Sequence, residues 1–218
     1  MKFFRAKNFN WKYILGEILL LFIGINLAIW FNDWNASKEV QKNKEIALDK
    51  IEGEIRTNLE QLKENSAQNQ KVPDFFDELN RLKGENKNLI LAPDAIQTFI
   101  RKYPEFIRER DSSMVEDGLF EYDLDTYINL EITDLSSIAW DISKSTGIFH
   151  EFGYDCLYQL QAMYNTQHLV KNELANATDA LRNKSFDDLV MTLKVMGQLE
   201  DQLEDQYNDM LGRIGDCK

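Results

Sequence analysis

The sequence predicts an all-α protein with one N-terminal transmembrane helix and an extramembrane antiparallel helical bundle. The 218 residues contain only 3 Pro and 10 Gly, which disfavours a turn-rich β fold. Residues 13–31 form an apolar segment, and several later segments repeat apolar residues at spacings of three and four. With 44% hydrophobic residues, the remainder is long enough for one ordinary domain.

The membrane segment runs from Tyr13 to Phe31 and reads YILGEILLLFIGINLAIWF. At ~1.5 Å per residue its length is ~28 Å, close to the hydrocarbon thickness of a bilayer. Trp11 and Tyr13 flank one end and Trp30 and Trp34 the other, as expected for membrane-interface anchors. No small-x-small cleavage site follows the segment, so we expect a retained anchor rather than a cleaved signal peptide.

The charge distribution predicts the orientation of this anchor. The basic segment 1–12 contains Lys2, Arg5, Lys7 and Lys12 and no acid, whereas the whole chain has a formal charge of -12. By the positive-inside rule, we expect the N-terminus in the cytoplasm and the C-terminal domain on the far side of the membrane, which in a Gram-negative cell is the periplasm. The acidic domain disfavours binding to nucleic acid.

Two polar residues, Glu17 and Asn26, lie inside the apolar segment. A carboxylate at membrane depth costs about 2.5 kcal/mol or more, so it favours a site in contact with protein. Gly24 and Ala28 fall on the face of Glu17, and small residues allow a second helix to approach closely. We expect membrane lipid as one partner, and helix contacts through these residues as the basis of a homo-oligomer or of binding to other membrane subunits. The alternative is that Glu17 is protonated or reaches the headgroups, and that Gly24 is incidental.

The segment 32–70 is predicted to be a membrane-proximal helix that Pro73 closes. Segment 71–132 is predicted to contain short helices, at 74–82 and 94–103, and loops. Residues 114–128 are expected to form a loop with short elements, although their period-2 alternation also fits a short hairpin. The apolar face of the membrane-proximal helix comprises Leu48, Ile51, Ile55, Leu59 and Leu62.

The segment 133–218 is predicted to be the helical bundle. Thr133 and Asp134 are expected to cap a helix that ends before a left-handed Gly147. A second helix is expected over 151–182, and Ser185 is expected to begin the last one in a capping box with Asp188. Its apolar stripe comprises Leu189, Leu193, Met196, Leu199, Leu203, Tyr207, Met210 and Ile214.

The sequence contains no familiar catalytic signature. His150 and His168 are the only histidines, and no HExxH, Walker A or GxGxxG pattern occurs. The acidic stretch 121–125 lacks the Gly and the terminal Glu of an EF-hand loop, and it is interpreted as a solvated face. We therefore expect no enzyme activity, no cofactor and no metal.

Cys156 and Cys217 are separated too widely for a metal knuckle or a CxxC redox motif. In an oxidising compartment they could form a disulfide that ties the C-terminus to an earlier helix. Two free thiols are the alternative.

The opening of the chain resembles an uncharacterised family of single-pass envelope proteins from Bacteroidota, in which a YxxGEIxLxxIGIxxAxxxxxWN pattern recurs. That family also tends to have a Trp before a Ser/Thr-Gly pair and then a Tyr-containing helix, and residues 137–164 are similar. The resemblance implies an inner-membrane location and a periplasmic domain, and it implies no catalytic residue or ligand. The matching positions are Tyr13, Gly16, Glu17, Ile18, Leu20, Ile23, Gly24, Ile25, Ala28, Trp34 and Asn35.

These features predict a membrane-anchored interaction or scaffold protein, acting as an accessory subunit or a homo-oligomer of an envelope complex. A periplasmic bundle that senses a ligand and signals through a partner subunit is the alternative. An unfamiliar enzyme site around Trp140, His150 and Tyr154 is disfavoured, because no nucleophile, base and orienting group can be assembled there.

Overall fold

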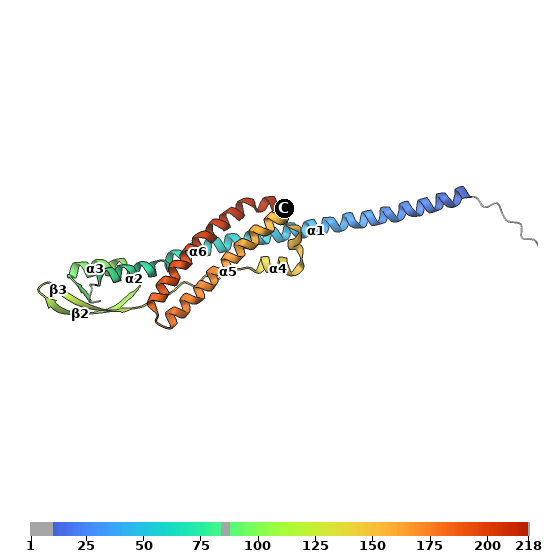
Figure 1. Ribbon diagram of the computed structural model, residues 1–218. Coiled ribbons are helices and arrows are strands. Elements are labelled where there is room, and N and C mark those ends of the chain that lie inside the picture. Colours follow the sequence, from blue (N-terminus) through green and yellow to red (C-terminus); the bar gives the residue numbers. More distant parts are fainter. Residues whose placement is uncertain (1–10, 84–87, 218) are drawn as a thin grey trace, which may run out of the picture.

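The computed structural model describes residues 11–83 and 88–217. Helix α1 (Trp11–Asn69) begins with the exposed apolar segment and continues without a break into the domain, so it forms the long axis of the molecule (Figure 1). The segments predicted over 13–31 and 32–70 are therefore parts of one helix. Its buried apolar face contains Leu48, Ile51, Ile55 and Leu62, with Leu59 packed partly against the core.

Helices α5 (Tyr154–Arg182) and α6 (Phe186–Arg213) form an antiparallel hairpin, and α6 packs on α1. Helix α4 (Ile138–Thr146) and the 3₁₀ turn η1 (Ile148–Glu151) contact α1 at the end of the domain nearest the exposed half of α1 (Figure 1). A second 3₁₀ turn, η2 (Ile214–Cys217), follows α6. The left-handed conformation predicted for Gly147 is confirmed by its φ of 77°.

A small sheet makes the protein mostly α rather than all-α. At the opposite end of the domain lie α2 (Lys71–Leu82), β1 (Leu89–Leu91), α3 (Pro93–Lys102), β2 (Ile107–Glu116) and β3 (Leu119–Thr126) (Figure 1). The strands pair antiparallel in the order β1-β3-β2. The expectation of a loop over 114–128 was therefore wrong, and the alternative of a short hairpin there is what the structure contains. Residues 111–116 of β2 are exposed on both faces, so burial imposes no alternating pattern on their sequence.

Phe75 of α2 organises the core of this end of the domain. Its ring centroid lies 5.5 Å from those of Phe99 and Tyr103 and 5.1 Å from that of Phe106. The cluster holds α2, α3 and the start of the β2–β3 hairpin together.

Several helix ends differ from the prediction. Helix α1 ends at Asn69, and Pro73 lies in the first turn of α2, where a helix needs no backbone donor. The helix expected from Thr133 begins at Ile138, because residues 127–137 run as an extended segment between the helices. The helix expected from Glu151 begins at Tyr154. Ser185 precedes α6 but makes no side-chain capping bond, so the predicted capping box does not form.

Candidate functional site

The exposed N-terminal half of α1 is the first candidate site. In the described part of the chain, one helix is long and apolar enough to cross a membrane, and none of its most apolar window is buried. The predicted span, residues 13–31, packs on no other element and projects away from the domain (Figure 1). Of the predicted basic segment 1–12, Lys2, Arg5 and Lys7 lie outside the described residues. The side chains of the span are therefore available to lipid or to another helix.

Glu17, Gly24 and Ala28 lie along one face of this span. Two shallow hollows mark the face, with volumes of about 390 and 610 Å³, and Gly24 lines both. Glu17 lines the first hollow and Ala28 the second. A Cβ added at Gly24 would meet nothing within 4 Å. The face is thus concave around Gly24, with a carboxylate at one end of the concavity.

Asn26 points away from this face and has a partner in its own helix. Its Nδ2 donates to the carbonyl oxygen of Phe22 at 2.7 Å. This bond satisfies one of the two amide donors, and it weakens the expectation that Asn26 needs a partner across helices. The face of Glu17 and Gly24 therefore remains the better candidate for a helix contact.

Aromatic side chains lie at both ends of the span. Trp11 and Tyr13 are exposed at the N-terminal end. At the other end the Trp30 and Trp34 rings stack with centroids 6.4 Å apart, and the Lys38 Nζ lies 3.8 Å from the Trp34 centroid. This arrangement suits an interface where rings meet headgroups and a cation points to water.

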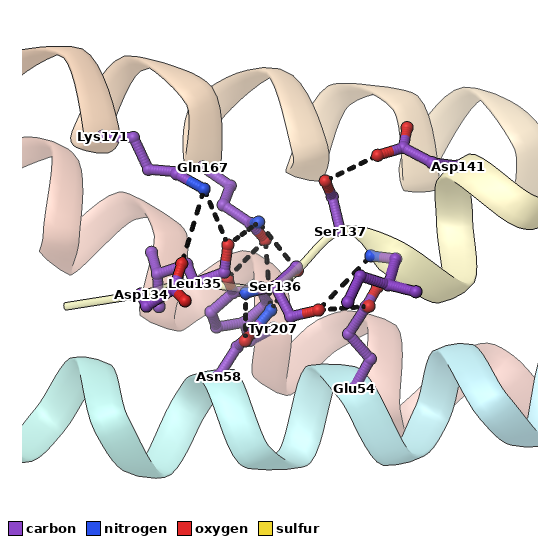
Figure 2. Close-up of polar contacts among 11 residues, drawn as sticks. Glu54, Asn58, Asp134, Leu135, Ser136, Ser137, Asp141, Gln167, Lys171 and Tyr207 are labelled. Carbon is purple, nitrogen blue, oxygen red and sulfur yellow. Dashed lines mark hydrogen bonds and ion pairs between the residues drawn. The ribbon is translucent and has the colours of Figure 1, made fainter.

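A second cluster, which sequence reasoning missed, holds the extended segment 131–137 between α1 and α5 (Figure 2). The Asn58 amide binds the backbone of Ser136 in two ways, accepting from its N–H and donating to its carbonyl, each at 2.8 Å. The Asn69 amide binds Glu131 in the same two ways, each at 2.9 Å. Side-chain amides thus replace the neighbouring strand that an extended segment ordinarily needs.

Glu54 connects α1 to the start of α4. Its Oε2 accepts from the hydroxyl of Ser136 and the N–H of Ala139, both at 2.8 Å, and its Oε1 accepts from the Tyr164 hydroxyl at 2.7 Å. Burial, together with this carboxylate, raises the pKa of Tyr164 far above its ordinary value. The Tyr164 ring stacks on Trp140 at 5.3 Å. Helix α1 therefore holds α4 and α5 through one carboxylate.

Gln167 completes the cluster from α5. Its Oε1 accepts from the Tyr207 hydroxyl at 2.8 Å, and its Nε2 donates to the carbonyl oxygens of Leu135 and Ser136 at 3.1 and 2.9 Å. Lys171 Nζ donates to the same Leu135 oxygen at 3.2 Å (Figure 2). Gln167 and Lys171 interrupt the apolar stripe of α5, and this interruption was the signal in the sequence. All these contacts are internal, so the cluster supports the fold rather than a ligand.

The remaining sequence candidates lie apart from both clusters. Cys156 and Cys217 form a disulfide that joins the start of α5 to η2, with Cα atoms 5.8 Å apart. His150 and His168 are exposed, and the described residues contain no group of three or more His, Cys, Asp or Glu placed to hold a metal ion.

No family model, curated protein or solved structure matches this chain, so the sequence pattern and the structure carry the functional argument.

Proposed function

We propose that this is a single-pass membrane protein whose exposed N-terminal helix both anchors it and binds another membrane helix. It acts as a scaffold or accessory subunit of an envelope complex. The observation that carries the proposal is the concave, fully exposed face of the span, which places a carboxylate beside Gly24. An exposed apolar surface of this size is unfavourable in water and favourable in a bilayer.

Two observations support an orientation with the N-terminus in the cytoplasm and the domain in the periplasm of an inner membrane. Four basic residues and no acid precede the span. The domain that follows it contains the Cys156–Cys217 disulfide, and such bonds persist in oxidising compartments.

The membrane helix supports a binding role because Glu17 is costly in lipid alone. A carboxyl group at this depth costs about 2.5 kcal/mol or more, and a hydrogen bond from a neighbouring helix lowers this cost. The hollow at Gly24 lets such a helix approach closely, as small residues do in membrane helix pairs. Binding rather than catalysis is the role we assign to the protein.

The test is purification of the full-length protein in a mild detergent, followed by native mass determination of the eluate. We expect a complex heavier than one 25.5 kDa chain, either a homo-oligomer or an assembly with a foreign membrane protein. Gly24→Leu fills the hollow and should lower the fraction in the complex about tenfold, because a lost close contact of about 1.4 kcal/mol has that effect.

Gly16→Leu is the matched control. It makes the same substitution in the same helix, about 80° around the axis from Gly24, and it also enters open space. Glu17→Leu tests the carboxyl separately. Monomers in the unsubstituted protein, or equal effects of the two glycine substitutions, would overturn the proposed binding face.

A further inference from the structure

An apolar groove lies between α1 and α4, at the end of the domain nearest the exposed span. It has a volume of about 310 Å³ and is lined by aliphatic side chains from three elements. Ile46 of α1, Ile142 of α4 and Ile148 of η1 form its apolar wall, and Lys50 lies at its edge. Ile46 is 48% exposed and Ile142 is 55% exposed. These side chains lie together, so they form one continuous apolar surface rather than a scattering of single apolar residues.

The groove lies on the same side of α1 as the concave face of the span. At ~100° per residue, Ile46 falls within about 20° of Glu17 around the helix axis, as Gly24 and Ala28 do. Ile46 lies ~33 Å beyond Gly24 along an unbroken helix. A second helix that packs at Gly24 and continues alongside α1 therefore reaches the groove.

The residues between the two sites suit contact with an identical chain. Two copies in one membrane are held at the same depth by the same aromatic residues, so equal heights face each other. At these heights the face presents Asn35, whose amide both donates and accepts, and then Glu39 and Lys42. Measured around the helix axis from Glu17, Glu39 lies at about +40° and Lys42 at about -20°, on opposite sides of the face. The acid of each copy can therefore meet the base of the other copy.

We propose that a second copy of this chain, parallel to the first, occupies the groove. The two-fold axis runs parallel to α1, between the two copies. Ile46 of each copy packs against Ile46 and Ile142 of the other. This inference rests on the proposed function and identifies the partner at that face. It extends the contact between the copies from the membrane into the domain. Contact between the membrane helices alone would not require the domains to touch.

The test places a photoreactive benzoylphenylalanine at single positions of the full-length chain in intact membranes. With the probe at Ile46, we expect an adduct of twice the 25.5 kDa chain mass, and mass spectrometry should locate its second end near Ile46 or Ile142. Ser37 is the control position, because it is exposed and lies on the opposite side of α1. Ile46→Asp should lower adduct formation from a probe at Ile142 at least about tenfold, while Val40→Asp leaves it unchanged.

The outcomes separate this inference from the proposed function. An adduct from Ile46 to a different protein overturns the second copy as occupant, and it leaves the membrane-helix function standing. No adduct at Ile46, with a chain-to-chain adduct from a probe at Leu21, overturns the groove contact alone. No adduct at either position, together with monomers in mild detergent, overturns both.

Discussion

The spacing of Asn58 and Asn69 on α1 matches the spacing of Ser136 and Glu131, the two residues whose backbone they bind. Eleven residues of helix rise about 16 Å, and five residues of extended chain also cover about 16 Å. Between them, Asn65 Nδ2 donates to the Thr133 hydroxyl at 3.0 Å. A row of helical amides thus binds one extended segment in register.

Loss of the Asn58 amide should destabilise the domain. Asn58→Ala leaves the N–H of Ser136 without this partner, and an unsatisfied group costs about 1–3 kcal/mol, whereas the Ser136 carbonyl keeps its hydrogen bond from Gln167. We expect the free energy of unfolding to fall by about 1–3 kcal/mol, measured by urea unfolding in mild detergent with near-UV circular dichroism. Asn172→Ala, on the exposed side of α5, should change it by less than about 0.5 kcal/mol. Equal effects would show that the amide bonds are unimportant.

Two glycines of α6 should respond differently to alanine. A Cβ at Gly197 would overlap Gln70, whose Nε2 donates to the Leu193 carbonyl oxygen at 3.1 Å. Gly197→Ala should therefore displace this amide, and the loss of its hydrogen bond, about 1 kcal/mol, should cancel the gain in helix propensity, also about 1 kcal/mol. A Cβ at Gly212 meets nothing within 4 Å, so Gly212→Ala should be neutral or stabilise by up to about 1 kcal/mol. Thermal unfolding of the two variants side by side tests this prediction.

Glu200 should make stability depend on pH. Burial raises the pKa of this carboxyl above its ordinary value of 4.5, although the Ser66 hydroxyl donates to it at 2.6 Å. The contribution of Glu200 to stability is therefore complete below about pH 4.5, the ordinary pKa of the carboxyl. It is lost as the pH rises through the raised pKa of the folded state. Glu200→Gln should remove this loss, so the variant should gain stability over the unsubstituted protein between acidic and neutral pH.

Glu204→Gln is the control for this pH dependence. Glu204 lies one turn further along α6 and pairs with Lys63 at the surface. Its substitution should leave the pH profile of unfolding nearly unchanged, since surface pairs contribute little. Parallel profiles for Glu200→Gln and the unsubstituted protein would contradict the assigned role of burial.

Reduction of the disulfide should destabilise the domain. The bond closes a loop with a sequence separation of 61 residues, for which chain entropy predicts about 4 kcal/mol as an upper figure. We expect dithiothreitol to lower the unfolding midpoint of the unsubstituted protein. The double variant Cys156→Ser and Cys217→Ser should unfold at the lower midpoint whether or not dithiothreitol is present.

The sequence was sufficient for the elements whose packing is local. The apolar stripe of α6, the Pro93 start of α3 and the left-handed Gly147 all follow from neighbours within one or two turns. A loop was preferred to the β2–β3 hairpin because residues 111–116 of β2, which are exposed on both faces, add no alternation to that of residues 114–128. The extended segment 131–137 was missed because its hydrogen-bond partners lie about 30 to 80 residues away in sequence.

The candidate site, too, was predictable from the sequence only where its residues are close together in the chain. Glu17 stands out in sequence because a carboxyl is unusual in an apolar run, and Gly24 because it falls on the same helical face. The groove at Ile46 does not, because its other wall comes from α4, almost a hundred residues later. A single isoleucine among polar residues looks incidental until the fold places Ile142 beside it.

Because α1 is continuous, the length of the stretch 32–42 determines how the domain is oriented relative to the apolar segment. Because the helix is unbroken from Trp11 to Asn69, each residue in that stretch fixes the azimuth of the domain relative to the apolar segment. Removing one residue would turn the domain by about 100° and lower it by ~1.5 Å, whereas removing seven would turn it by only about 20°. The number of residues in this stretch therefore sets both the rotation of the domain about the helix axis and its height above the membrane. The side chains of the stretch do not change either quantity.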